Sequence, residues 1–190
     1  MNIKLITTVV FSFLYSILMV ACKPATNDFS LQENNRFFSL KDYFKQEIGK
    51  LAEKGKAQKI VEVDGKHENQ IIDTIDYSKE LGVFSSSDIN RPAWSDKYEV
   101  DSVFNSSKEL VQLNFNELDK KLNTHLVSVS FEHQVVSRVY IENITESPIA
   151  TSIQHLTYIP SFGYTIESIQ KSKIRGEHDF KIDVRFMTND

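Results

Sequence analysis

The last strand-like stretch of the chain, Phe180-Lys181-Ile182-Asp183-Val184-Arg185-Phe186, alternates apolar and charged side chains without a break. Period-two alternation is typical of a β-strand with one buried and one solvated face. Strands of this kind belong mostly to antiparallel sheets, because parallel strands are usually covered on both faces. The stretch therefore predicts a closing strand in an antiparallel sheet that has one wet face.

Similar strand-like segments precede this one, separated by short polar turns. Between the first two stands Asp64-Gly65, a dipeptide suited to a two-residue hairpin turn of type I′. The segments run over 58–63, 66–75, 98–104, 109–115, 125–133, 135–143, 149–159 and 164–173.

Helical periodicity occurs before the first strand. Apolar residues recur at spacings of three and four, and Ser39-Leu40-Lys41-Asp42 resembles a capping box, which predicts an amphipathic helix ending near Gly55. A short helix is also expected within 78–88, and a helical turn within 116–122. The apolar positions of the first helix are Phe37, Leu40, Phe44, Ile48 and Leu51.

The order of these segments predicts an α+β fold. Because all connections are short, we expect an N-terminal amphipathic helix packed on a curved antiparallel sheet of about six to eight strands. We expect residues 36–190 to form a single α+β domain. Residues 22–35 are polar, include Pro24 and show no periodicity, which indicates a flexible tether.

The first 21 residues have the layout of an export signal. A single cation, Lys4, precedes a largely apolar run from Leu5 to Ala21 that contains no acid, glycine or proline. Its length lies at the lower edge of a membrane-spanning helix, so length alone leaves a retained anchor open. The run ends in Leu18-Met19-Val20-Ala21-Cys22, which resembles the bacterial lipobox except that Met19 stands where leucine is usual.

This resemblance implies that Cys22 is lipidated and becomes the mature N-terminus. In such processing the thiolate accepts a diacylglyceryl group, the signal is cleaved, and the new amine is acylated in most Gram-negative bacteria. At about 0.8 kcal/mol per buried CH₂, two or three acyl chains hold far more firmly than one. We expect an exported protein tethered to the outer membrane, because Lys23 rather than aspartate follows Cys22.

Two alternatives remain for this segment: a generic signal peptide with an incidental cysteine, or an uncleaved anchor. Cys22 is the only cysteine in the chain, so no intramolecular disulfide can form.

The charge balance argues against binding to nucleic acid or to an anionic membrane surface. The chain of 190 residues has 22 Lys and Arg against 26 Asp and Glu, a net charge of −4, and removal of residues 1–21 with their single cation leaves −5. A mildly acidic, evenly mixed balance offers no electrostatic basis for binding nucleic acid or an anionic membrane surface.

Motifs that would indicate catalysis are missing. There is no Gly-x-Ser-x-Gly elbow, no nucleotide-binding glycine loop and no His-Glu-x-x-His, so we expect no catalytic residues, no metal and no cofactor. A zinc site would require His133, His155 and His178 to meet across strands. A hydrolase is the remaining enzymatic alternative, and it would require paired carboxylates in a cleft. Such pairs are Asp73 with Asp76 and Glu132 with Glu142.

The best candidate for a binding site surrounds the only tryptophan. Trp94 follows Pro92 and is flanked by Arg91 and Tyr98. A large aromatic side chain beside a cation is a common anchor in protein interfaces. We therefore name Arg91, Trp94 and Tyr98 as possible partner-binding residues; the alternative is that Trp94 only closes one end of the sheet.

Three segments carry a resemblance beyond the lipobox. They are Phe38-Ser39-Leu40-Lys41-Asp42-Tyr43-Phe44, Ser87-Asp88-Ile89-Asn90-Arg91-Pro92-Ala93-Trp94 and Leu156-Thr157-Tyr158-Ile159-Pro160. Together they resemble a group of uncharacterised lipoproteins of Gram-negative bacteria, over most of the mature chain. The resemblance implies a shared fold and location and supplies no catalytic residues. More remotely, the expected architecture is similar to the half-barrel of Lol-type lipoprotein carriers and receptors, at the level of the fold alone.

Three functions are therefore considered. The first is a non-enzymatic envelope lipoprotein that binds a protein partner or supports assembly, through the wet face of the sheet or the Trp94 segment. The second is a carrier or receptor for lipid or another apolar ligand, which would need a hollow that the helix over 36–54 leaves empty. The third is a hydrolase.

Overall fold

The computed structural model describes residues 36–52, 55–174 and 176–187. The predicted signal peptide (1–21), Cys22 and the predicted tether (22–35) lie outside the described residues.

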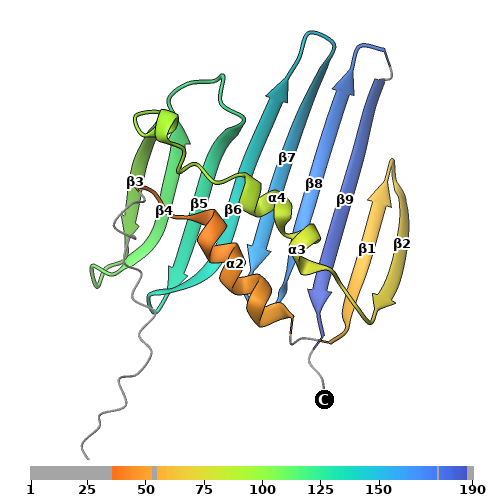
Figure 1. Cartoon of the computed structure of the whole chain (residues 1–190), viewed down its shortest axis with the longest axis horizontal. Helices are drawn as coiled ribbons and strands as arrows, with labels where there is room; N and C mark the ends of the chain where they lie inside the picture. Colours follow the sequence, from red (N-terminus) through yellow and green to blue (C-terminus); the bar gives the residue numbers. More distant parts are fainter. Residues whose placement is uncertain (1–35, 53–54, 175, 188–190) are drawn as a thin grey trace, which may run out of the picture.

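A single antiparallel sheet of nine strands dominates these residues (Figure 1). Neighbouring strands are hydrogen-bonded in the order β2-β1-β9-β8-β7-β6-β5-β4-β3, so β2 and β3 form the two edges. The strands are β1 Ala57–Val63, β2 Lys66–Ile72, β3 Tyr98–Phe104, β4 Leu110–Glu117, β5 Thr124–Glu132, β6 Val135–Glu146, β7 Ala150–Ile159, β8 Gly163–Ser172 and β9 Gly176–Phe186.

Helices cover one face of the sheet and form a second layer. Figure 1 shows α2 (Leu40–Leu51), α3 (Tyr77–Glu80) and α4 (Gly82–Ser86) lying across the middle of that face. A short 3₁₀ helix, η1 (Pro92–Trp94), follows in the loop that leads to β3. The opposite face carries no helix among the described residues. The fold is therefore mostly β.

The hydrophobic core lies between the helices and the sheet. Tyr158 of β7 is completely buried. The centroid of its ring lies 5.1 Å from that of Phe44 in α2 and 6.3 Å from that of Phe84 in α4. The apolar side chains of α2 point into this core, as its predicted amphipathic pattern requires. The fully buried aliphatic residues around them include Leu40, Leu81, Ile89, Val127, Val129, Val139, Ile141, Leu156 and Val184.

The alternation of the closing strand is only partly matched by burial. Val184 is fully buried, whereas Phe180 at the other end of β9 is 36% exposed. In Figure 1 the β6–β7 and β8–β9 hairpins extend beyond the helices. Phe180 therefore keeps the predicted face of the strand but has no helix above it.

Several local expectations can be compared with the structure. The Asp64-Gly65 turn is confirmed, with φ of 50° and 78°. The short helix within 78–88 is present as α3 and α4, interrupted at Leu81. The sheet has nine strands where six to eight were expected.

Two local predictions differ from the structure. The helical turn expected within 116–122 is present only in part: β4 continues to Glu117, and one hydrogen-bonded turn follows, in which the Leu122 amide donates to the Asp119 carbonyl at 3.0 Å. His133 does not lie on β5 but in the turn after it, with φ of 50°.

Candidate functional site

The loop between α4 and β3 brings the three predicted binding residues together. The guanidinium of Arg91 lies over the Trp94 ring, 4.2 Å from its centroid, and the Trp94 and Tyr98 rings are 6.3 Å apart. Arg91 is exposed, Trp94 is half-buried and Tyr98 is buried. The three side chains therefore form a stack that runs from solvent into the core.

Local backbone geometry places this stack. Pro92 begins η1, where a residue without an N–H is well tolerated. The Trp94 amide donates a hydrogen bond to the Arg91 carbonyl at 2.8 Å, and the Lys97 amide donates to the Trp94 carbonyl at 3.0 Å. These two turns direct Arg91 and Trp94 to the same side of the loop.

Tyr98 anchors the inner end of the stack. Its hydroxyl donates to the backbone carbonyl of Thr124 at 2.6 Å, and its ring contacts Phe37 at 5.8 Å. Burial, reinforced by the Glu117 carboxylate, raises the pKa of Tyr98, so its hydroxyl stays a donor. Tyr98 is thus a structural support, and Arg91 and Trp94 are the members that solvent or a partner can reach.

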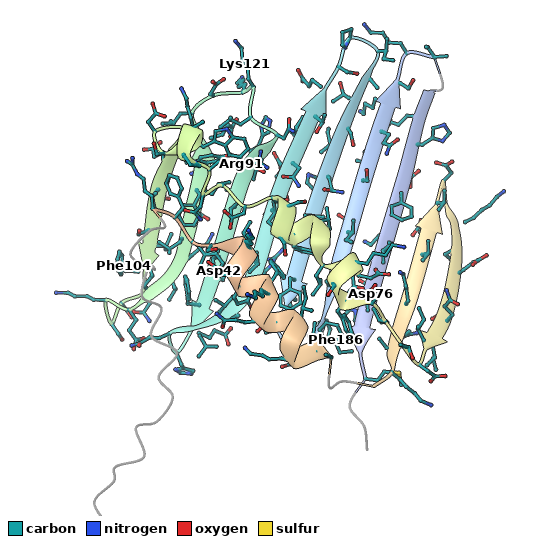
Figure 2. The ribbon with its side chains drawn as sticks, in the orientation of Figure 1. Asp42, Asp76, Arg91, Phe104, Lys121 and Phe186 are labelled. Atoms are coloured by element: carbon teal, nitrogen blue, oxygen red, sulfur yellow. The ribbon has the colours of Figure 1, made fainter. Side chains whose placement is uncertain are left out.

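A second loop adds cations to the same region. The Leu118 amide donates to the Lys97 carbonyl at 2.8 Å, which joins the β4–β5 loop to the loop that carries Trp94. Leu118 is exposed, and so are Lys120 and Lys121; Figure 2 shows Arg91 and Lys121 toward the same corner of the sheet. We use the name basic corner for Arg91, Trp94, Lys97, Leu118, Lys120 and Lys121.

The two loops together carry four cations, Arg91, Lys97, Lys120 and Lys121, and three acids, Asp88, Asp96 and Asp119, whereas the whole chain is net negative. Sequence reasoning named Arg91 and Trp94 but missed Lys97, Leu118 and the Lys120–Lys121 pair. The lysine pair is visible in the sequence, but the contact between the two loops is a property of the tertiary structure.

The neighbouring Asp88 and Asn90 have a structural role. The Phe37 amide donates to the Asn90 side-chain oxygen at 2.9 Å, and the Asn90 side-chain amide donates to the Phe38 carbonyl at 3.2 Å. The Lys41 amide donates to the Asp88 carboxylate at 2.9 Å. Two of the three segments quoted for the lipoprotein resemblance therefore contact each other, and their polar residues hold the start of α2 in place.

The face of the sheet opposite the helices, called the bare face below, is charged, but its positive and negative side chains lie beside one another. A row of ionisable residues crosses it in register, and acids alternate with potential cations along the row. Lys181 binds Glu167 at 2.6 Å, and His155 lies 3.5 Å from Glu142. The row is Glu142, His155, Glu167, Lys181, Glu62 and His67. Because opposite charges neighbour one another, this face presents no patch of a single sign.

The residues considered for hydrolysis are not brought together. Asp73 lies 3.4 Å from Lys56, and Asp76 caps α3 by accepting a hydrogen bond from the Lys79 amide at 3.1 Å. Glu142 faces His155, whereas Glu132 lies at the exposed end of β5.

The histidines considered for zinc also lie apart. His155 lies beside Glu142 on the bare face, His178 lies 3.0 Å from Asp64, and His133 lies in the β5–β6 turn. Within 36–52, 55–174 and 176–187, no three histidines, cysteines or acids gather in a way that could hold a metal ion.

Among the described residues, two surface hollows are lined mostly by polar and charged side chains. One, of about 430 Å³, lies on the bare face and is lined by Gln58, Ile60, Glu62, Lys181, Asp183 and Arg185. The other, of about 390 Å³, lies between the ends of the β6–β7 and β8–β9 hairpins and includes Lys171, Lys173 and Glu177. On the covered face, Phe44 and Phe84 fill the space between helices and sheet.

Comparison with known protein families, characterised proteins and solved structures finds no match to this chain. The resemblance to uncharacterised lipoproteins and to Lol-type half-barrels therefore stays a prediction. Among the described residues, no helix combines the length and apolar character needed to cross a membrane.

Proposed function

We propose that this chain is a non-enzymatic lipoprotein of the bacterial envelope, anchored by lipidated Cys22, and that it serves as a binding or assembly module. Its domain binds an acidic surface of a protein partner through the basic corner. The lipobox-like sequence supports the anchor, and its Lys23 favours the outer membrane.

The observation that carries the binding proposal is the exposed Arg91 guanidinium, held 4.2 Å from the Trp94 ring centroid. Stacking on the indole fixes the arginine before a partner arrives, which lowers the entropy cost of forming an ion pair. Tyr98 fixes the indole in turn, because its hydroxyl and ring are tied into the core. Arginine and tryptophan are also the residue types that dominate protein interfaces.

The charge distribution selects the kind of partner. Lys97 lies in the loop that carries the stack, and Lys120 and Lys121 lie in the loop joined to it, so an approaching carboxylate meets more cations than acids on an otherwise acidic protein. Acidic side chains that converge on this corner would gain from several cations at once, mainly through the association rate. The self-compensating bare face offers no comparable selectivity.

The arrangement of the helices argues against the alternative of a lipid carrier. That function requires an apolar hollow behind the sheet. α2 and α4 occupy the middle of this face, and their Phe44 and Phe84 rings meet Tyr158 in the core.

Charge reversal tests the binding proposal. The native chain, purified from its own membranes after chemical crosslinking, is expected to retain an acidic protein partner that an Arg91→Glu, Lys121→Glu variant loses. The matched control is Lys41→Glu, Lys45→Glu, which reverses two exposed cations on α2. Equal recovery of the partner by both double variants, or no crosslinked partner with the native chain, would contradict the proposal.

A further inference from the structure

The two edges of the sheet differ in how they are protected against pairing with another strand. Edge strands expose unpaired backbone groups, and proteins usually guard them with charged side chains. In β2 the first five residues, Lys66 to Gln70, are all polar, and the one strongly exposed large apolar residue is Ile71, at 62%. In β3, Val100, Val103 and Phe104 are 47%, 41% and 58% exposed. β3 is therefore the less protected edge.

The backbone of β3 can accept another strand. The Leu118 amide donates to the Lys97 carbonyl, so residues 97 and 118 form a hydrogen-bonded pair that continues the register of β3 and β4 by one residue beyond Tyr98 and Glu117. Hydrogen-bonded pairs alternate along an antiparallel ladder, so residues 99, 101 and 103 also turn their N–H and C=O groups toward β4. The register shifts between Val103 and Phe104, and beyond the shift the Asn105 amide donates to the Glu109 carbonyl at 3.0 Å, so residue 105 also faces β4. Val100, Ser102 and Phe104 turn theirs outward, and no strand of the described residues lies beyond β3.

We propose that β3 pairs antiparallel with β3 of a second copy of this chain, about a twofold axis at Ser102. In this register Ser102 lies opposite Ser102 of the second copy, and Val100 lies opposite Phe104 at two symmetric positions. The outward backbone groups of each copy then meet those of the other, and Val100 and Phe104 of the two copies cover one another.

The charges of β3 select this register. Centred on Ser102, the pairing places Asp101 opposite Val103 and Glu99 opposite Asn105. Centred one residue earlier, it would place the two Asp101 carboxylates directly opposite each other, which is destabilising. A twofold contact uses one surface twice, and β3 is self-complementary in this way. This complementarity favours a second copy over a foreign strand.

The contact is small. A single pair of seven-residue strands buries less than the roughly 1,200–2,000 Å² of a stable interface, so the isolated domains should associate weakly. Two copies held on one membrane would meet at a higher effective concentration. The pairing is therefore best tested with the full chain in its own membranes.

A cysteine at the twofold axis provides the test. Opposed residues of a hydrogen-bonded antiparallel pair have Cα atoms about 5.5 Å apart, within the range that a disulfide spans. Ser102→Cys in the full chain should form an oxidant-induced dimer at least ten times faster than Asn69→Cys on the opposite edge. Adding Val100→Lys should slow this dimer formation about tenfold, because it removes the two apolar pairs. The unmodified chain, with Cys22 alone, gives the background.

Equal crosslinking of the Ser102→Cys and Asn69→Cys chains would overturn the proposal, because it would reflect random collision. So would absence of the dimer in a Ser102→Cys chain that is as protease-resistant as the native one. A crosslinked product with the mass of a different protein would show that β3 takes a foreign strand.

Discussion

Glu47 is a carboxylate placed inside the core, on the buried face of α2. Its side chain accepts a hydrogen bond from the Tyr158 hydroxyl at 2.7 Å and binds Lys50 at 2.7 Å. A buried charge is tolerated when it is paired and hydrogen-bonded. The carboxylate thus bridges α2 to β7 across 111 positions of the chain, which specifies where along the sheet the helix lies.

Tyr158→Phe removes one hydrogen bond of Glu47 and leaves a buried carboxylate oxygen without its donor. Hydrogen bonds to charged groups contribute about 1.5–3 kcal/mol, so we expect a loss of about 2 kcal/mol in the free energy of unfolding in urea. The control is Tyr140→Phe on the bare face, which should change stability by less than about 0.5 kcal/mol. Similar effects of both substitutions would argue against the bridging role of Glu47.

Buried tyrosines also make stability depend on pH. Burial, reinforced by nearby carboxylates, raises the pKa of Tyr43, Tyr158 and Tyr164 well above the ordinary value of 10.0. Above pH 10 these hydroxyls therefore ionise in the unfolded chain but stay protonated in the folded one.

The unfolded state then binds fewer protons, so stability is fully present below pH 10 and falls as the pH rises above it. We expect the melting temperature to decline from pH 9 to pH 11, with tyrosinate absorbance appearing together with unfolding. Tyr164→Phe should reduce the slope by at most about 1.4 kcal/mol per pH unit. Gradual ionisation of these tyrosines in the folded protein near pH 10 would contradict this account.

At the scale of elements, the close approach of β8 and β9 depends on a glycine. A Cβ built on Gly163 would lie 1.9 Å from the backbone oxygen of Val184, and that oxygen belongs to the neighbouring strand. Backbone cannot yield as a flexible side chain does, so Gly163→Ala must separate the two strands.

We expect Gly163→Ala to destabilise the domain by about 3 kcal/mol or more, measured by chemical unfolding. Gly49 is the matched control, because a Cβ there meets nothing within 4 Å and the residue lies in α2. Gly49→Ala should stabilise the domain by about 0.5–1 kcal/mol. If Gly163→Ala and Gly49→Ala changed the free energy of unfolding in the same direction, the clash of the new Cβ at position 163 with the Val184 oxygen would not account for the effect.

The positions of the helices and strands were more predictable from the sequence than the exposure of their side chains and the contacts between loops. Alternation in β9 and spacing in α2 are local patterns, and each survives in the structure because one face of the element packs on the core. The exposure of Phe180 could not be predicted, since it depends on how far the helices extend over the sheet. Likewise, Arg91 and Trp94 are close in the chain, but Lys121 joins them only through the contact between Leu118 and Lys97.

At the scale of the whole molecule, the basic corner lies near the point where the described chain begins. Phe37 contacts Tyr98, and Tyr98 contacts Trp94. The 14 residues from Cys22 to Asn35 can span at most about 50 Å when fully extended. In the proposed anchored state the start of the described chain, beside the basic corner, therefore stays within about 50 Å of the membrane, where a partner of the same envelope can reach it.

The basic corner is held near the membrane only if Cys22 is lipidated, so lipidation of Cys22 is the decisive prediction for the whole molecule. Cys22→Ser removes the thiol that accepts the diacylglyceryl group. We expect complete loss of labelled palmitate and transfer of the processed domain to the soluble fraction, or accumulation of the unprocessed precursor. Lys23→Asp is the matched control, because it should keep the label but move the protein toward the inner membrane. A Cys22→Ser chain that still carries palmitate would refute lipidation at Cys22 and, with it, the placement of the basic corner at the membrane.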